Sequence, residues 1–358
     1  MSAHEILIAV MAVFAVLGGL DRIFGNRFGL GQEFENGIIA MGSMGLAMIG
    51  MIALAPVLAD VLRPVVVPVY EFLGADPAMF AGTLLACDMG GGQLGRELAG
   101  SSEAALLGGV ITGSMMGSTI VFTIPVAMGM VPQEDRPDLA KGVLAGIVTI
   151  PVGIFAGGLV AGYPLLMVLR NLIPIVLIAA VIVLGLWKAE SAMIRGFELF
   201  GKGVIAVITV GLVALIVQSL TGFVVIKGLA PLEESFNIVG NIALVLAGAF
   251  PLVYTLTKVL RKPLMKLGKL LGVNEVAAAG LLATLANSIA TFGMVKDMDK
   301  RGKVVNKSYS VSAAFVFGDH LGFTAGFSPE LLPAVVVGKL VGGISAVAVA
   351  LLLSKKKA

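Results

Sequence analysis

Two carboxylates and one imidazole lie in stretches of the chain that are otherwise apolar. Asp88 occurs in 86–90 (ACDMG), and Asp319 and His320 occur together in 317–322 (FGDHLG). An ionisable side chain at membrane depth is costly, so it marks a substrate or ion site by default. We find no lysine or arginine to match the two carboxylates, which therefore need a positive partner. A small organic cation carried by the protein would serve, and so would protons or a metal ion.

Other side chains are suited to the rest of such a ligand. Phe122 or Phe323 would present an aromatic face to a cation. Asn287, Ser118 and Thr119 offer an amide and two hydroxyls. The predicted substrate-binding residues are therefore Asp88, Asp319, His320, Asn287, Ser118, Thr119, Phe122 and Phe323.

Each of these polar residues also has a structural alternative. Asp88 would equally cap a half-helix, because a carboxylate accepts hydrogen bonds from free backbone N–H groups. Asp319 would orient His320, and His320 would be a neutral, hydrogen-bonded structural residue. Asn287, Ser118 and Thr119 would then only link neighbouring helices.

The sequence offers little for enzymatic chemistry. One candidate histidine without a second ligand at helical spacing is a poor metal site, so we predict no metal and no cofactor. The glycines at 90–92 lack the following Lys-Ser/Thr of a nucleotide-binding loop. An intramembrane enzyme and a membrane sensor or scaffold remain the alternatives. We find no nucleophile that an enzyme would need, and no soluble output domain that a sensor or scaffold would need.

The composition requires a bilayer around the elements that carry these residues. Hydrophobic residues make up 58% of the chain and charged residues 13%, and the mean hydropathy is +1.02. Soluble domains are about 45–50% apolar and about 25% charged. A spanning helix needs about 20 mostly apolar residues, and nine runs approach or exceed that length: 6–20, 37–59, 104–131, 140–162, 173–187, 204–220, 238–257, 310–327 and 331–353. We therefore expect an all-α polytopic membrane protein with about 9–11 transmembrane helices.

Charge and cysteine usage exclude other classes. The net charge of +3 is too small to indicate nucleic-acid binding. The single cysteine, Cys87, excludes a disulfide within the chain and is more often a small packing residue. No basic segment precedes the first apolar run as it would in a signal peptide, so we expect that run to be retained as the first helix.

Two distant parts of the chain resemble one another. Residues 61–64, 73–76 and 81–82 match residues 259–263, 271–274 and 279–280 at a constant offset of 198 residues. Internal repeats are common in secondary transporters, whose substrate lies where the halves meet. We expect one transmembrane domain over residues 1–358, with repeat one at about 1–165, a linker helix at about 166–198 and repeat two at about 199–354.

Basic residues predict how the repeats are oriented. Cytoplasmic loops carry an excess of lysine and arginine, and two basic clusters flank 276–295 on both sides. A re-entrant hairpin with Asn287 at its tip places both clusters on the cytoplasmic side, together with the tail Lys355–Lys357. Its counterpart, 78–98, is broken by three glycines and would enter from outside, so the repeats would be inverted. The alternative is 11 plain crossings with parallel repeats. The predicted hinge or helix-break residues are Gly90, Gly91, Gly92, Gly318 and Gly322.

The same segments resemble the ethanolamine permeases of ethanolamine-utilisation operons, the EutH family. The resemblance covers nearly the whole chain and is densest at 80–91 (FAGTLLACDMGG), 113–122 (GSMMGSTIVF), 142–151 (GVLAGIVTIP), 283–287 (ATLAN), 301–304 (RGKV), 311–315 (VSAAF) and 318–323 (GDHLGF). It implies a carrier of ethanolamine in the bacterial inner membrane. This chain departs from the family in shorter connections after the fifth and seventh helices and in Gly92-Gln93 after the paired glycines.

The residues and the resemblance suggest the same mechanism. Ethanolamine is a primary amine that is protonated near neutral pH, as lysine is. Asp88 and Asp319 would bind the ammonium, and Asn287, Ser118, Thr119 or His320 would hold the hydroxyl, before a movement of one bundle exposes the site to the other side. The alternatives are a channel-like facilitator and a carrier of another small organic cation. Proton symport, sodium symport and uniport remain open, and so does a homodimer, which is common among carriers with moving bundles.

Overall fold

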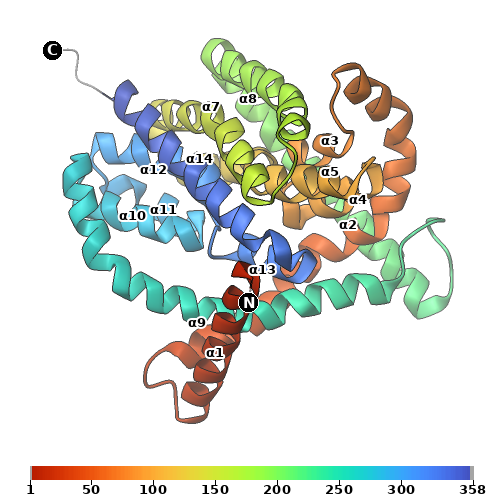
Figure 1. Cartoon of the computed structure of the whole chain (residues 1–358), viewed down its shortest axis with the longest axis horizontal. Coiled ribbons are helices and arrows are strands. Elements are labelled where there is room, and N and C mark those ends of the chain that lie inside the picture. Colours follow the sequence, from red (N-terminus) through yellow and green to blue (C-terminus); the bar gives the residue numbers. More distant parts are fainter. Residues whose placement is uncertain (1, 355–358) are drawn as a thin grey trace.

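The computed structural model describes residues 2–354, and within them every regular element is helical (Figure 1). Among the described residues, seven helical stretches are long and apolar enough to cross a membrane: Ala3–Ile23, Leu30–Phe72, Ser102–Met130, Gln133–Val160, Leu165–Thr221, Leu232–Leu260 and Pro329–Leu353. The expected all-α polytopic membrane protein is thereby confirmed. The tail Lys355–Lys357, expected on the cytoplasmic side, lies outside the described residues.

Seven long helices are fewer than the expected crossings because some apolar runs merge and others break. The runs 173–187 and 204–220 both lie in α8 (Leu165–Thr221), whose two halves meet at a non-helical residue, Ala189. The run 310–327 is not one helix, because α12 (Lys300–Ala313) ends before a turn and α13 (Asp319–Phe327) begins after it. Hydropathy could not predict that break, because the turn residues are themselves apolar.

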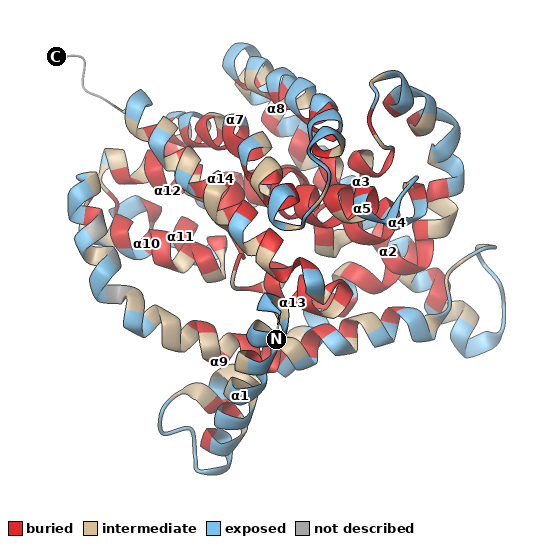
Figure 2. Cartoon of the chain, viewed as in Figure 1, coloured by how far each residue is buried: buried red, intermediate tan, exposed pale blue. Residues whose placement is uncertain are grey.

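Burial separates a packed centre from an apolar outside. Buried residues gather in the middle of the molecule, and exposed residues lie along the outer faces of α1 (Ala3–Ile23), α8 and α9 (Leu232–Leu271) (Figure 2). Many of the exposed residues are large and apolar, such as Val181 and Leu184 of α8 and Leu244 of α9. An outer surface of this composition is suited to lipid.

The first broken segment folds back on itself. It consists of α3 (Ala78–Leu84), the 3₁₀ turn η1 (Cys87–Met89) and α4 (Gly91–Leu98). Asp76 closes its base, because one carboxylate oxygen accepts from the Ala78 amide at 2.9 Å and the other from the Gly100 amide at 3.0 Å. The predicted break is therefore present.

Removal of the Asp76 carboxylate should open this base. In Asp76→Ala the amides of Ala78 and Gly100 lose their acceptor, and a lost cap of this kind costs about 0.5–2 kcal/mol. We expect a lower melting temperature in detergent. Asp60→Ala, at an exposed position of α2 (Leu30–Phe72), is the control and should leave the melting temperature unchanged. Equal melting temperatures for the two variants would contradict this role of Asp76.

The second broken segment has the same plan. In α10 (Glu275–Ala286) and α11 (Ser288–Met294), the Thr291 hydroxyl reaches back to the Gly280 carbonyl at 3.0 Å, so the two helices run antiparallel. At the base the Asn274 amide donates to Asp299 at 2.8 Å. Each segment follows a long helix, α2 or α9, and is preceded by a glycine with positive φ, Gly74 or Gly272. The two hairpins lie on opposite sides of the molecule (Figure 1).

A π-helical stretch packs against the first hairpin. The stretch after α5 (Ser102–Leu106) is wound as π-helix over η2 (Leu107–Gly117) and η3 (Thr119–Thr123) before α6 (Ile124–Met130). Gly82 of α3 lies against the backbone of Gly108, and Gly117 lies against the backbone of Leu85. Glycine is needed at both positions, because a Cβ would overlap a backbone carbonyl oxygen.

Two further contacts place the C-terminal elements. The turn between α12 and α13 pairs with the end of α10, since the amides of Phe315 and Phe317 donate to the Thr284 and Leu285 carbonyls at 3.2 and 2.8 Å. Those carbonyls belong to the helix end, where partners within the helix are missing. Helix α14 (Leu332–Leu353) crosses α7 (Arg136–Val160) where Gly338 lies against Gly153, which brings their backbones close together.

Candidate functional site

A small cavity of about 190 Å³, here named the central cavity, lies between the two halves of the chain. Residues from α2, the η1 region, the π-helical stretch, the turn before α13 and the start of α13 line it: Ser43, Met44, Ala47, Ala86, Asp88, Met89, Ser118, Phe122, Phe315, Asp319 and His320. Five of the predicted substrate-binding residues are therefore brought together here, although more than 200 positions separate Asp88 from Asp319 in the sequence.

Asp88 is placed by the break in the first hairpin. It is the middle residue of η1, and its side chain is 21% exposed. The chain turns after it at Gly90, whose φ of +102° favours glycine and where a Cβ would overlap Met51. Of the three glycines, only Gly90 lies in the break, because α4 already begins at Gly91.

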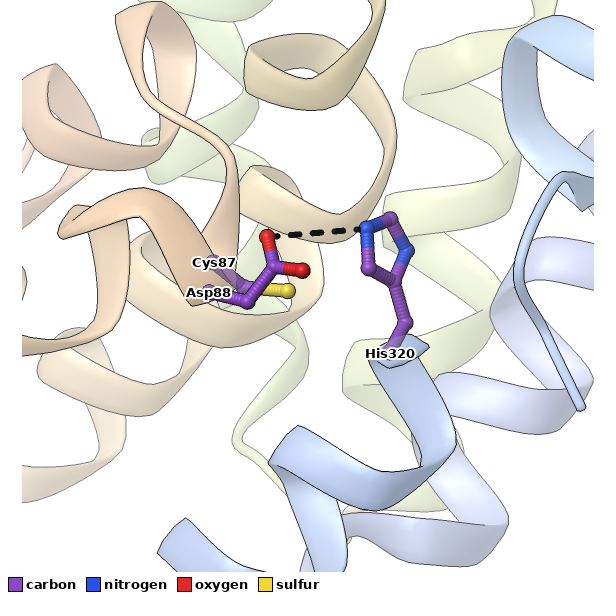
Figure 3. A group of neighbouring side chains, drawn as sticks. All are labelled: Cys87, Asp88 and His320. Carbon is purple, nitrogen blue, oxygen red and sulfur yellow. Dashed lines mark ion pairs between the residues drawn. The ribbon is translucent and has the colours of Figure 1, made fainter. Parts of the chain in front are cut away.

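Asp319 and His320 begin α13, directly after the turn that pairs with α10. Gly318 precedes them and must be small, because a Cβ there would overlap the Ala286 carbonyl oxygen. The N-terminal end of a helix favours a negative charge, and Asp319 occupies this position in α13. The His320 ring is 3% exposed, and its Nε2 lies 3.8 Å from Oδ1 of Asp88 (Figure 3). The carboxylate of one half of the chain thus faces the imidazole of the other.

A residue that the sequence analysis missed lies behind His320. Lys339 is 1% exposed, and its Nζ donates to the Ser114 carbonyl at 2.5 Å and lies 3.0 Å from Nδ1 of His320. The expectation that no basic side chain matches the carboxylates is therefore wrong. Lys339 stands alone in the middle of the apolar run 331–353, and an ionisable residue at that depth was the signal that would have found it.

Aromatic rings form one wall of the central cavity. The Phe122 and Phe315 rings meet edge to face with centroids 5.3 Å apart, and the Phe315 and His320 rings lie 5.2 Å apart. Phe315 has a φ of +63°, which is rare for a bulky residue and is held by the pairing of the turn with α10. Phe323, the other predicted aromatic, does not line this cavity and instead stacks on Phe327 at 4.8 Å.

Of the three predicted residues with a hydroxyl or amide group, only Ser118 lines the central cavity. Ser118 lines the cavity, and its hydroxyl donates within its own helix to the Ser114 carbonyl at 3.0 Å, which leaves its oxygen lone pairs to accept. Thr119 is fully buried and donates to the carbonyls of Met115 and Val311. Asn287 caps α11 by accepting from the Ile289 amide at 2.7 Å.

Two neighbouring cavities adjoin the central one. A cavity of about 280 Å³ contains Asn287, Glu33 and Tyr254, and Asp319 lines both it and the central cavity. A larger cavity of about 590 Å³ shares Ser43, Ala47, Met89 and Phe122 with the central cavity on another side. Asp319 therefore lies at the boundary between two cavities.

Three potential metal ligands meet at the site, although sequence spacing predicted none. Ligand atoms of Cys87, Asp88 and His320 lie within 4.8 Å of one another (Figure 3). The Lys339 ammonium contacts Nδ1 of His320, on the other side of the imidazole ring. Its positive charge would repel a metal cation bound by these three ligands. The geometry thus offers three ligands, with a basic side chain directly behind the imidazole.

The remaining predicted hinge glycines serve as close contacts in this structure. Gly91 and Gly92 lie in the first turn of α4, and a Cβ on Gly92 would approach the Phe323 ring at 2.7 Å. Gly322 packs on Leu246 of α9. Their predicted part in a hinge stays a prediction.

Comparison with known proteins identifies the family. The family model described as "Ethanolamine utilisation protein, EutH" matches residues 3–353. A "Probable ethanolamine permease EutH" of Listeria monocytogenes is 60% identical over 99% of this chain and 95% of its own length. The protein of the same name from Salmonella typhimurium is 49% identical over 99% of this chain and 97% of its own.

A Bacillus subtilis relative, "Uncharacterized protein YxeR", is 47% identical over 98% of this chain and 95% of its own. No solved structure matches the chain. The resemblance noted in the sequence is thus confirmed along its whole length, and the chain belongs to the EutH family of ethanolamine utilisation proteins.

Proposed function

We propose that this protein carries ethanolamine, as the ethanolammonium cation, across the bacterial inner membrane. The observation that carries the proposal is that Asp88 and Asp319, from different halves of the chain, face one small cavity. Two relatives carry the name "Probable ethanolamine permease EutH", and this name supplies the substrate.

The lining of the cavity suits this substrate. A primary ammonium is charged near neutral pH, as lysine is, and carboxylates give charge-assisted hydrogen bonds to it. The faces of Phe122 and Phe315 add a surface that attracts cations. Ser118 retains free lone pairs for the substrate hydroxyl, so both ends of ethanolamine find partners.

Transport follows by alternating access between two inverted repeats. The proposal is supported by the shared plan of the two hairpins, each closed at its base by an Asp or Asn, and by their location on opposite sides of the molecule (Figure 1). Asp319, which lines two cavities, passes the ammonium from one to the other as the halves move.

Uptake of labelled ethanolamine into proteoliposomes tests the function. We expect uptake that saturates with ethanolamine concentration and is accelerated by unlabelled ethanolamine inside the vesicles, because a carrier returns faster when loaded. Empty liposomes give the background. Uptake that neither saturates nor responds to internal substrate would identify a channel, and no uptake above background would overturn the proposal.

The same vesicles determine the coupling. Uptake is compared at acidic and alkaline external pH, and with inward proton or sodium gradients imposed separately. Stimulation by one gradient alone assigns that ion as the partner, whereas dependence on the membrane potential alone assigns a uniport of the cation.

A further inference from the structure

Lys339 is a buried cation that the proposed transport mechanism leaves unused. It lies in the middle of α14, an otherwise apolar helix, and is 1% exposed. A buried ammonium costs several kcal/mol unless charges and hydrogen bonds compensate it. Its two contacts, the Ser114 carbonyl and Nδ1 of His320, come from η2 and α13. Such a cost indicates that the charge itself has a function.

The contact with His320 connects Lys339 to Asp88. An ammonium has donors only, so it donates to Nδ1 and the neutral ring carries its proton on Nε2. That nitrogen lies 3.8 Å from Oδ1 of Asp88. Lys339, His320 and Asp88 therefore form a row, in which a neutral imidazole separates the ammonium from the carboxylate.

Three ionisable side chains set the charge around the central cavity: Asp88 from η1, Asp319 from α13 and Lys339 from α14, which lies behind His320. With all three ionised, their charges sum to one negative charge. The lining residues from α2 and the π-helical stretch carry no charge. The neighbouring cavity is lined by Glu33 and by Tyr254, whose ring centroid lies 4.1 Å from Nζ of Lys258.

We propose that Lys339 sets the charge selectivity of the site by acting as a counter-ion for one of the two carboxylates. With Lys339 in place, one monovalent amine neutralises the cavity and a second positive charge is repelled. Without Lys339, two carboxylates face the cavity uncompensated, and a diamine becomes the better guest. The inference rests on the proposed function, because it assumes that the cavity receives an amine.

Two ligands of matched length test this selectivity. 3-Aminopropan-1-ol carries one ammonium group, whereas propane-1,3-diamine carries two near neutral pH. Their affinities are measured by ligand-induced thermal stabilisation of the purified protein and by competition with labelled ethanolamine. We expect the wild-type protein to prefer the amino alcohol by at least about tenfold, since a like charge at such a site costs at least about 1.4 kcal/mol.

In Lys339→Met this preference should fall by more than its wild-type value and so reverse in favour of the diamine. Lys307→Met is the matched control, because Lys307 is also 1% exposed but donates to the Asp135 carbonyl at 3.0 Å rather than to His320 of the central cavity. The control should keep the wild-type ratio. If Lys339→Met does not fold, Lys339→Gln, which retains a donor for Ser114, replaces it.

A merely structural role of Lys339 would weaken both ligands together and leave their ratio unchanged, and this result would overturn the inference. If ethanolamine itself does not bind the wild-type protein, the proposed function fails and the inference fails with it. If ethanolamine binds but neither test amine does, only the inference is overturned. If both amines bind and only the ratio fails to respond, the proposed function stands without this role of Lys339.

Discussion

Asp88→Asn should reduce ethanolamine uptake at least about 30-fold, because loss of one partner of a buried charge pair costs about 2–5 kcal/mol and each 1.4 kcal/mol is tenfold. The asparagine has nearly the shape of the aspartate, so the cavity keeps its size while one carboxylate charge is lost. Asp319 then lines the central cavity with Lys339 behind His320, so their charges cancel and no net charge remains to attract an ammonium. Initial uptake rates in proteoliposomes, over a range of ethanolamine concentrations, measure the effect.

The control for this variant is Asp60→Asn, which changes the same functional group at an exposed position of α2. It should transport at the wild-type rate. Asp319→Asn is expected to behave like Asp88→Asn, because it also lines the central cavity. Wild-type uptake by both cavity variants would show that neither carboxylate binds the substrate. Asp88 would then only cap a turn, as its position in η1 also allows.

Gly82→Ala should abolish uptake although Gly82 does not line the central cavity. A Cβ at this position would overlap the Gly108 carbonyl oxygen and lie 2.7 Å from the Gly113 nitrogen, and both are backbone atoms that no side-chain rotation can move away. Overpacking of a tight interior costs about 1–3 kcal/mol. The first hairpin must therefore shift against the π-helical stretch, and Asp88 shifts with it.

The effect should appear in both folding and function. We expect a lower melting temperature in detergent and an uptake rate near background for the fraction that folds. Gly203→Ala in α8 is the matched control, since an added Cβ there meets nothing within 4 Å. It should keep its activity and gain slightly in stability, because alanine favours the helix by about 1 kcal/mol over glycine. An active, stable Gly82→Ala protein would contradict the close packing of the hairpin.

The broken helices illustrate how far residue patterns lead. The segment around Asn287 was expected to break because basic clusters flank it on both sides, and the chain does break between α10 and α11. The break near Asp88 was expected at three glycines, but it spans Leu85–Gly90 and only Gly90 lies in it. The glycine-rich composition indicates that this segment does not form one continuous helix. The packing of Met51 and of the π-helical stretch against it determines the residue at which the helix ends.

The predictions of substrate-binding residues also divide into those that follow from residue type and those that depend on packing. Asp88, Asp319 and His320 were found because an ionisable group in an apolar run is costly wherever the chain folds. Thr119 and Phe323 were indistinguishable from Ser118 and Phe122 in the sequence, yet they point into packed interior rather than into the central cavity. The direction in which a side chain points depends on helix rotation, and neighbouring helices set that rotation.

The membrane location, the family and the candidate charged residues follow from the amino-acid sequence alone, because hydropathy, motif and desolvation cost are properties of short segments. Only the tertiary structure decided that Asp88 and Asp319 share a cavity, that Phe315 helps to form its wall, and that Lys339 stands behind His320. These contacts join residues that are distant along the chain. The packing of backbones at glycines, which no local pattern encodes, brings them together.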